Sequence, residues 1–252
     1  MNGNLRLVAP DGALAEAVVY PDGPSLVAAA AGLVVERANE AIAARGKFSI
    51  ALSGGNTPKP VYARLASARL DWSRVHVYFG DERCVPPDDP LSNYRMAKEA
   101  LLDRIAIPPA NVRRMRGENP PEAAAAQYEE ALRSGLGADG RLDLVLLGLG
   151  DDGHTASLFP GLAAVTETQR WVFASYVEAA GRWRISLTPP VINAAGLVAF
   201  LVEGAGKADV LRRVLLGPRQ PVVLPAQAIR PAERPALWLL DAAAAAKLDR
   251  PT

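Results

Sequence analysis

The sequence predicts an α/β protein built on an open, mostly parallel sheet with helices on both faces. Helical patterns alternate along the chain with short runs rich in β-branched and aromatic residues, as expected for parallel strands joined by helical crossovers. Several of these runs lack strict alternation of polar and apolar residues, which indicates strands buried on both faces. Half of the 252 residues are hydrophobic and no shift in composition marks a linker, so we expect a single domain over residues 1–252.

The first part of the chain contains two helix and strand pairs. An alanine-rich segment predicts a helix over residues 25–45, and the apolar run after it predicts a strand over residues 48–52. A proline-opened segment predicts a helix over residues 58–67. The β-branched and aromatic run that follows predicts a strand over residues 75–79.

The same two patterns continue to the end of the chain. Short β-rich runs predict strands at residues 142–147, 171–176, 184–187, 197–202 and 236–240. Helical patterns predict helices at residues 93–104, 121–134 and 207–216, and the alanine-rich tail predicts a terminal helix over residues 242–248.

Composition limits the classes of partner. The 28 Lys and Arg residues nearly balance 27 Asp and Glu residues, so no overall charge favours nucleic acid or an anionic membrane, and we expect a small-molecule partner. The single cysteine, Cys84, excludes an internal disulfide and leaves the redox compartment open, with a reducing cytosol as the simplest assumption. No apolar stretch approaches membrane-spanning length and the start lacks a signal core, so we expect a cytoplasmic protein. The oligomeric state stays open, with a monomer as the preferred assumption.

The two histidines of the chain lie in different contexts. His76 lies inside a β-rich run, and we interpret it as a structural strand residue. His154 follows an apolar run and a turn that contains three glycines and two carboxylates. A turn histidine satisfied by local carbonyls is the simpler alternative. Ligands of open α/β sheets bind at the carboxyl ends of strands, however, and an imidazole with an ordinary pKa of about 6.5 can exchange a proton there, so we predict a functional role for His154.

The turn between the strand at residues 48–52 and the next helix has the composition of an anion site. Free backbone N–H groups at a helix start, the helix dipole and two hydroxyls suit a phosphate ester. An ordinary glycine turn is the alternative, and a nucleotide P-loop is excluded because the Gly-Lys-Ser/Thr ending is missing. We expect Thr57 to be the N-cap of the helix that Pro58 opens. The predicted anion-binding turn consists of Ser53, Gly54, Gly55, Asn56 and Thr57.

Three charged residues, Asp81, Glu82 and Arg83, follow the strand at residues 75–79. A solvated charge cluster is the alternative interpretation. Arg83 could donate a pair of hydrogen bonds to a phosphate, and Asp81 could accept one from a sugar hydroxyl or position a water molecule. We expect the following segment, residues 86–94, to form a loop that covers a pocket.

Two further cations, Arg184 and Lys207, lie at or near predicted strand boundaries. Each is a surface cation if taken alone, but Lys207 starts a helix after a glycine turn and could reach a bound phosphate as a point charge. A metal site is not expected, because one cysteine and two distant histidines cannot form the common nitrogen or sulfur ligand set. The pair Asp151 and Asp152 also lacks the spacing of a calcium loop.

Together these segments resemble the 6-phosphogluconolactonase family, the sugar-lactone hydrolases of the oxidative pentose phosphate pathway within the glucosamine-6-phosphate isomerase/deaminase-like superfamily. The resemblance covers about residues 28–240. It implies a Rossmann-like sheet of the NagB/RpiA type, a phosphorylated sugar lactone as substrate and no cofactor. The order and spacing of the matching segments carry it: residues 51–58, 79–83, 93–94, 148–161, 184–188 and 204–207.

Two positions favour the lactonases over the deaminases of this superfamily. The deaminases have tyrosine where this chain has Arg83, and an Asn-Glu-Pro ending where it has residues 157–161. Two positions also depart from the lactonase pattern. Asn56 stands where serine is common, and Pro190 stands where leucine or another apolar residue is common.

The resemblance and the chemistry of lactone hydrolysis together imply roles for these residues. His154 acts as general base and then general acid, and Asp152 orients it. Asp81 and Gly150 contact the sugar. The phosphate is bound by Ser53, Gly54, Gly55, Asn56, Thr57, Arg83, Arg184 and Lys207.

Three alternatives remain at this point. A deaminase on the same scaffold would use Asp81 to move a proton between sugar carbons. A non-catalytic sugar-phosphate sensor belongs to a different class, but such proteins tend to carry a DNA-binding segment or to lose the catalytic side chain. A dinucleotide-dependent dehydrogenase is weakly indicated by the G-x-G-x-x-G spacing at residues 148–153, which lies mid-chain without an acidic residue in the ribose-binding position.

Overall fold

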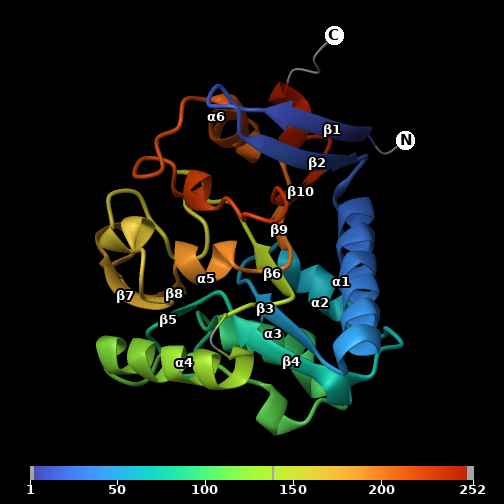
Figure 1. Cartoon of the computed structure of the whole chain (residues 1–252), viewed down its shortest axis with the longest axis vertical. Helices are drawn as coiled ribbons and strands as arrows, with labels where there is room; N and C mark the ends of the chain where they lie inside the picture. Colours follow the sequence, from blue (N-terminus) through green and yellow to red (C-terminus); the bar gives the residue numbers. More distant parts are fainter. Residues whose placement is uncertain (1–2, 138, 249–252) are drawn as a thin grey trace.

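The computed structural model describes residues 3–137 and 139–248. Its main sheet has seven strands in the order β1-β2-β10-β9-β6-β3-β4. Neighbours from β2 to β4 are parallel, and β1 runs antiparallel to β2. The open, mostly parallel sheet is therefore confirmed (Figure 1). Its strands are β1 (Gly3–Val8), β2 (Leu14–Tyr20), β3 (Phe48–Leu52), β4 (Val75–Phe79), β6 (Leu144–Leu147), β9 (Val198–Val202) and β10 (Leu237–Asp241).

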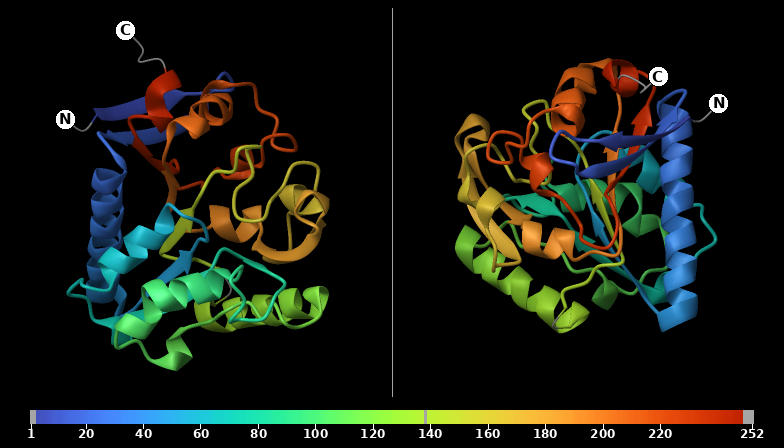
Figure 2. Two further views of the ribbon diagram at one scale, coloured as in Figure 1. Left: turned by 180° about the vertical axis from the view of Figure 1, so that it is seen from behind. Right: turned by 45° about the horizontal axis from the view of Figure 1, so that its top comes forward.

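Helices cover both faces of this sheet. In β3, Ile50 and Leu52 pack on one face with α1, α2 and α3, whereas Ala51 packs on the other face with α4, α5 and α6. Both faces are buried because successive strand residues point in opposite directions. Figure 1 and the two views of Figure 2 show α1 along one side of the molecule. The helices are α1 (Gly23–Arg45), α2 (Pro58–Leu65), α3 (Asn93–Ala100), α4 (Pro121–Leu136), α5 (Pro189–Asn193) and α6 (Ala208–Leu216).

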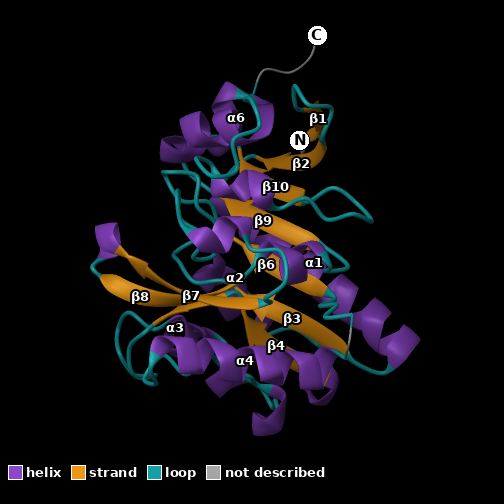
Figure 3. Ribbon diagram, turned by 60° about the vertical axis from the view of Figure 1, so that its left-hand side comes forward, coloured by secondary structure: helices purple, strands orange, loops and turns teal. Residues whose placement is uncertain are grey.

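A second, smaller sheet is absent from the sequence prediction. It is antiparallel, with the order β5-β8-β7, and consists of β5 (Asp81–Arg83), β7 (Val172–Val177) and β8 (Arg182–Leu187). The β-rich runs at residues 171–176 and 184–187 were correct as strands but not as members of the parallel sheet, because a short link at residues 178–181 folds them into a hairpin. Figure 3 shows this hairpin projecting beside the main sheet.

Other differences lie at the ends of the chain and at α5. Sequence reasoning missed the edge hairpin of β1 and β2, whose residues are only partly buried, and the short helix α5, which begins with Pro189 and Pro190. The predicted terminal helix is a single 3-10 turn, Ala244–Lys247. The other predicted helices and strands are present. The ends of β3 and β4 match the prediction to the residue, and those of the remaining elements differ by a few residues at most.

The topology creates a crevice at one edge of the sheet. From β3 the chain adds β4 on one side and then β6, β9 and β10 on the other, so the strand order reverses between β3 and β6. Ligands of open α/β sheets bind outside the carboxyl ends of strands at such a reversal. The segments after β3, β4, β6 and β9 carry the residues singled out above, except Arg184, which lies on β8. The parallel pairing brings these segments to the same edge.

Candidate active site

A cavity of about 630 Å³ lies at this edge. The structure places every predicted site residue in its lining except Asp152, which contacts His154 from behind. The predicted residues in the lining are Ser53, Gly54, Gly55, Asn56, Thr57, Asp81, Arg83, Gly150, His154, Arg184 and Lys207. Segments separated by up to about 150 residues in sequence therefore meet around one space.

The turn after β3 presents unpaired polar groups to the cavity. Within the described part of the chain, the backbone N–H groups of Gly54, Gly55 and Asn56 have no acceptor, and the buried Oγ of Ser53 has no hydrogen-bond partner. Tyr62 of α2 fixes the turn, since its hydroxyl accepts from the N–H of Ser53 at 2.9 Å and donates to the Ser53 carbonyl at 2.8 Å. Donors held in place without an acceptor form a site for an anion.

Glycine is required at two positions of this turn. Gly55 has a φ of +106°, which lies in the left-handed region. A Cβ at Gly54 would overlap with the side-chain amide of Asn93. The N-cap prediction for Thr57 is wrong in one respect. Its backbone is already helical and its side chain makes no capping hydrogen bond, so its hydroxyl is not engaged by the helix end.

Two arginines face each other across the small sheet. Arg83 on β5 pairs in register with Arg184 on β8, and like charges directly opposite one another are unfavourable without a counter-ion. Burial lowers the pKa of Arg184, and its Nε has no hydrogen-bond partner in the described part of the chain. Arg83 is held by the Leu91 carbonyl at 2.9 Å and by the Oδ1 of Asn93. Together the arginines supply the positive charge that a phosphate would neutralise.

The acidic pair after β4 divides into two roles. Glu82 is 2% exposed and accepts hydrogen bonds from the N–H groups of Arg83, Asn93 and Tyr94 and from the hydroxyl of Ser92. It thus ties the start of α3 to β5, although burial raises its pKa. Asp81 is 7% exposed and lines the cavity.

Asp81 is held in place through both of its carboxylate oxygens. Its Oδ1 accepts from Asn93 Nδ2 at 3.1 Å, and its Oδ2 accepts from Ser157 Oγ at 2.6 Å. A carboxylate oxygen can accept more than one hydrogen bond, so Asp81 can also accept one from a ligand.

His154 is oriented from three sides. Its Nδ1 lies 2.6 Å from Asp152 Oδ1, which also accepts its backbone N–H at 3.0 Å. Its ring stacks on Phe159 with centroids 4.1 Å apart, and Gly150 is needed because a Cβ there would overlap with the imidazole. Burial raises the pKa of Asp152, but the N–H and charge of His154 outweigh it, so the net shift is downward and the carboxylate stays ionised. An ionised Asp152 accepts the Nδ1 proton and leaves Nε2 as the basic nitrogen.

Lys207 reaches the cavity from the 3-10 turn after β9. Its Nζ lies 2.5 Å from Oδ1 of Asp151, the residue beside Asp152. Lys207, which the sequence predicts to bind the phosphate, is therefore paired with a neighbouring carboxylate in this structure.

Several residues of the lining were given no role by sequence reasoning, among them Asn93, Asp151, Phe159 and Glu203. Asn93, Asp151 and Phe159 stood within segments of the family resemblance, which was the available signal. The predicted covering loop is wrong for residues 86–92, since only Asn93 of that segment lines the cavity. Of the two positions that depart from the lactonase pattern, Asn56 lies in the lining and Pro190 is the second residue of α5.

His76 lies away from this cavity, as predicted. It is a half-buried residue of β4, and its Nδ1 lies 3.3 Å from Nη1 of Arg113. Residues 3–137 and 139–248 contain no group of three or more His, Cys, Asp or Glu side chains that could hold a metal ion. None of the helices in these two ranges is both long and apolar enough to cross a membrane.

Comparisons with known proteins agree on one family. A sequence profile described as "Glucosamine-6-phosphate isomerases/6-phosphogluconolactonase" matches residues 21–238. A protein of Nostoc sp. named 6-phosphogluconolactonase is 43% identical over 235 residues, covering 91% of this chain and 97% of its own. One of Synechocystis sp. with the same name is 45% identical, covering 82% of this chain and 88% of its own. The solved 6-phosphogluconolactonase of Trypanosoma cruzi superposes with a TM-score of 0.82 at 31% identity, over 92% of this chain and 96% of its own.

Proposed function

The chain belongs to the family of glucosamine-6-phosphate isomerases and 6-phosphogluconolactonases, and from that premise we propose that it hydrolyses 6-phosphoglucono-1,5-lactone to 6-phosphogluconate. This is the second step of the oxidative pentose phosphate pathway. One observation carries the proposal: a single cavity holds unpaired anion donors on one wall and an imidazole backed by a carboxylate on another.

The phosphate is bound by the turn after β3 and by the two opposed arginines. The N–H groups of residues 54–56 and the hydroxyl of Ser53 supply neutral donors, and Arg83, Arg184 and Lys207 supply charge. Binding energy from the phosphate, which is remote from the reacting carbon, holds the lactone in register for attack. Asp81 and Gly150 contact the sugar ring.

His154 moves the proton of the reaction. Its Nε2 removes a proton from water as the water oxygen bonds to the lactone carbonyl carbon. The bond from that carbon to the ring oxygen then breaks, and the imidazolium returns the proton to the ring oxygen, which becomes a hydroxyl. Asp152 holds the imidazole in the required tautomer and stabilises its charged form. No redox step is needed, because the carbonyl carbon gains one bond to a water oxygen and loses one bond to the ring oxygen.

Two sequence positions argue against the deaminase alternative. This chain has Arg83 and residues 157–161 where the deaminases have tyrosine and an Asn-Glu-Pro ending. Release of ammonia from glucosamine 6-phosphate would support that alternative instead. The single cysteine fits a reducing compartment, so the proposal places the enzyme in the cytoplasm.

The test compares 6-phosphoglucono-δ-lactone with the unphosphorylated glucono-δ-lactone, each measured above its spontaneous hydrolysis. We expect a strong preference in kcat/KM for the phosphorylated compound. Arg184→Gln should reduce that preference by about tenfold to a hundredfold, the size of one lost charged hydrogen-bonding group. The matched control is Arg182→Gln, the same change two residues earlier on β8 and outside the cavity lining. Equal rates for both lactones would overturn the proposal.

A further inference from the structure

The contact between Lys207 and Asp151 has no role in the reaction described above. Lys207 Nζ lies 2.5 Å from Asp151 Oδ1, and the two residues come from the loops after β9 and β6. The side chain of Asp151 is 85% exposed, whereas that of Lys207 is 27% exposed and lies along the cavity wall. In the described part of the chain, no other carboxylate lies within ion-pair distance of Lys207.

This arrangement places an exposed negative charge where a phosphate would need the cation. An ion pair between exposed groups contributes little stability, so a dianionic phosphate can displace it. The displaced carboxylate stays beside the phosphate, since both it and Lys207 line the same cavity. Both effects weaken phosphate binding. Displacing Asp151 breaks the existing ion pair, and the displaced carboxylate then repels the phosphate because both are negatively charged.

We propose that Asp151 forms an ion pair with Lys207 in the free enzyme and competes for this cation with the phosphate of the substrate and product. Asp151 thereby sets the strength of phosphate recognition, and its return to Lys207 promotes release of the phosphorylated product. The inference rests on the proposed function for its substrate, but its central claim concerns anion binding and can be tested without turnover.

The first experiment measures binding of inorganic phosphate and of 6-phosphogluconate by titration calorimetry. Asp151→Asn is expected to tighten both by about twofold to fivefold, the size of an exposed ion pair's contribution. The matched control is Asp103→Asn. Asp103 makes a similar exposed ion pair, with Oδ1 2.5 Å from Lys98 Nζ, but lies outside the cavity lining. Unchanged or weaker phosphate binding in Asp151→Asn would overturn the inference.

A double-mutant cycle tests whether Asp151 acts through Lys207. In a Lys207→Gln background there is no cation to compete for, so the effect of Asp151→Asn should shrink to that of repulsion alone. An undiminished effect in that background would show that Asp151 acts only as a distant charge, against the inference.

Steady-state kinetics distinguishes the proposed role of Asp151 from a purely structural one. In Asp151→Asn, KM for the phosphorylated lactone should fall and product inhibition by 6-phosphogluconate should strengthen by the same factor, so the preference over the unphosphorylated lactone rises. A uniform loss of kcat on both lactones would identify Asp151 as a support for the His154 loop and contradict the inference. If wild-type protein binds no phosphate, the proposed function and the inference fail together. If it binds phosphate and the variant binds it equally, the inference alone fails.

Discussion

The two histidines of the chain lie next to opposite charges. His154 Nδ1 faces the carboxylate of Asp152 at 2.6 Å, in a loop at the carboxyl edge of the sheet. His76 Nδ1 faces the guanidinium of Arg113 at 3.3 Å, inside β4. Burial, Arg113 and Lys47 all lower the pKa of His76, so this imidazole stays neutral. A carboxylate instead stabilises the imidazolium that forms when His154 takes a proton.

The comparison shows that partner and position, rather than residue type, decide which histidine can do acid-base chemistry. His154 has one nitrogen engaged and the ring exposed to a cavity with anion donors on its other wall. His76 pairs in register with Ser49 on the neighbouring strand and has no cavity of that kind. Substitutions at the two residues and at their partners should therefore differ in kind, and the expected effects can be ranked.

The largest effect is expected from His154→Ala. Loss of the group that removes and returns the proton should lower kcat by about 10²-fold to 10⁴-fold, because general acid-base catalysis typically contributes that much. The measurement is the initial rate of lactone hydrolysis above the uncatalysed background. Near-normal hydrolysis would remove His154 from its proposed role and end the contrast with His76.

Asp152→Asn is expected to have the next largest effect, a fall in kcat on the order of tenfold to a hundredfold. The amide can donate to Nδ1 and so hold the imidazole in the wrong tautomer. Circular dichroism and thermal unfolding serve as the control, since a half-exposed carboxylate contributes little to folding. If kcat is retained, the 2.6 Å contact between His154 and Asp152 stabilises the loop but does not contribute to catalysis.

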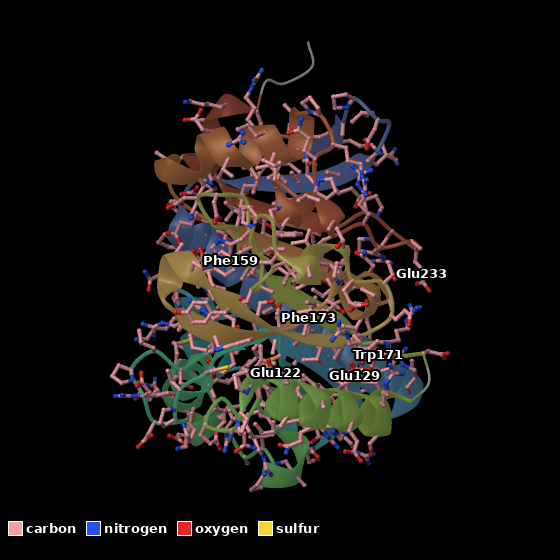
Figure 4. The ribbon with its side chains drawn as sticks, turned by 90° about the vertical axis from the view of Figure 1, so that its left-hand side faces the viewer. Glu122, Glu129, Phe159, Trp171, Phe173 and Glu233 are labelled. Carbon is pink, nitrogen blue, oxygen red and sulfur yellow. The ribbon has the colours of Figure 1, made fainter. Side chains whose placement is uncertain are left out.

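Phe159→Leu sharpens the comparison by removing the ring that supports His154. The stacked contact at 4.1 Å limits rotation of the imidazole, so kcat should fall by about tenfold while KM changes less. Phe173→Leu is the matched control. Phe173 lies on β7 (Figure 4), its ring contacts the guanidinium of Arg170, and it is outside the lining of the cavity. Equal losses from both substitutions would point to folding rather than to positioning of His154.

The central strands and the loops after them could be predicted because their sequence signals are local. Runs of mostly apolar residues identify β3 and β4 to the residue. The glycines after β3 mark a turn before a helix, and the first N–H groups of a helix have no partner within it, so the anion site could be predicted. The resemblance to a known family then located His154 and the cations around one site. These predictions required no knowledge of which strands pair.

The contacts that complete the site are long-range and could not be predicted in the same way. β5 consists of three charged residues, which give no strand signal, so the opposition of Arg83 and Arg184 became visible only from the pairing of β5 with β8. The pair of Lys207 and Asp151 joins loops 56 residues apart. Asn93 is recognisable from sequence as a helix start, but its contacts with Arg83 and Asp81 depend on how α3 packs against β5.

The smallest effect is expected from His76→Gln, and it concerns stability rather than rate. The folded-state pKa of His76 lies below the unfolded value of about 6.5, so the unfolded chain binds more protons between these two values. Stability therefore falls as the pH drops through that window. Glutamine cannot take up the proton, so the fall in Tm between pH 7.5 and pH 5 should be smaller by about 1–2 °C, since partial exposure screens the effect. The rate at pH 7.5 should stay within about twofold of wild type because His76 lies outside the cavity. A Gln variant with the same pH dependence of Tm as wild type would show that the environment of Arg113 does not hold His76 neutral.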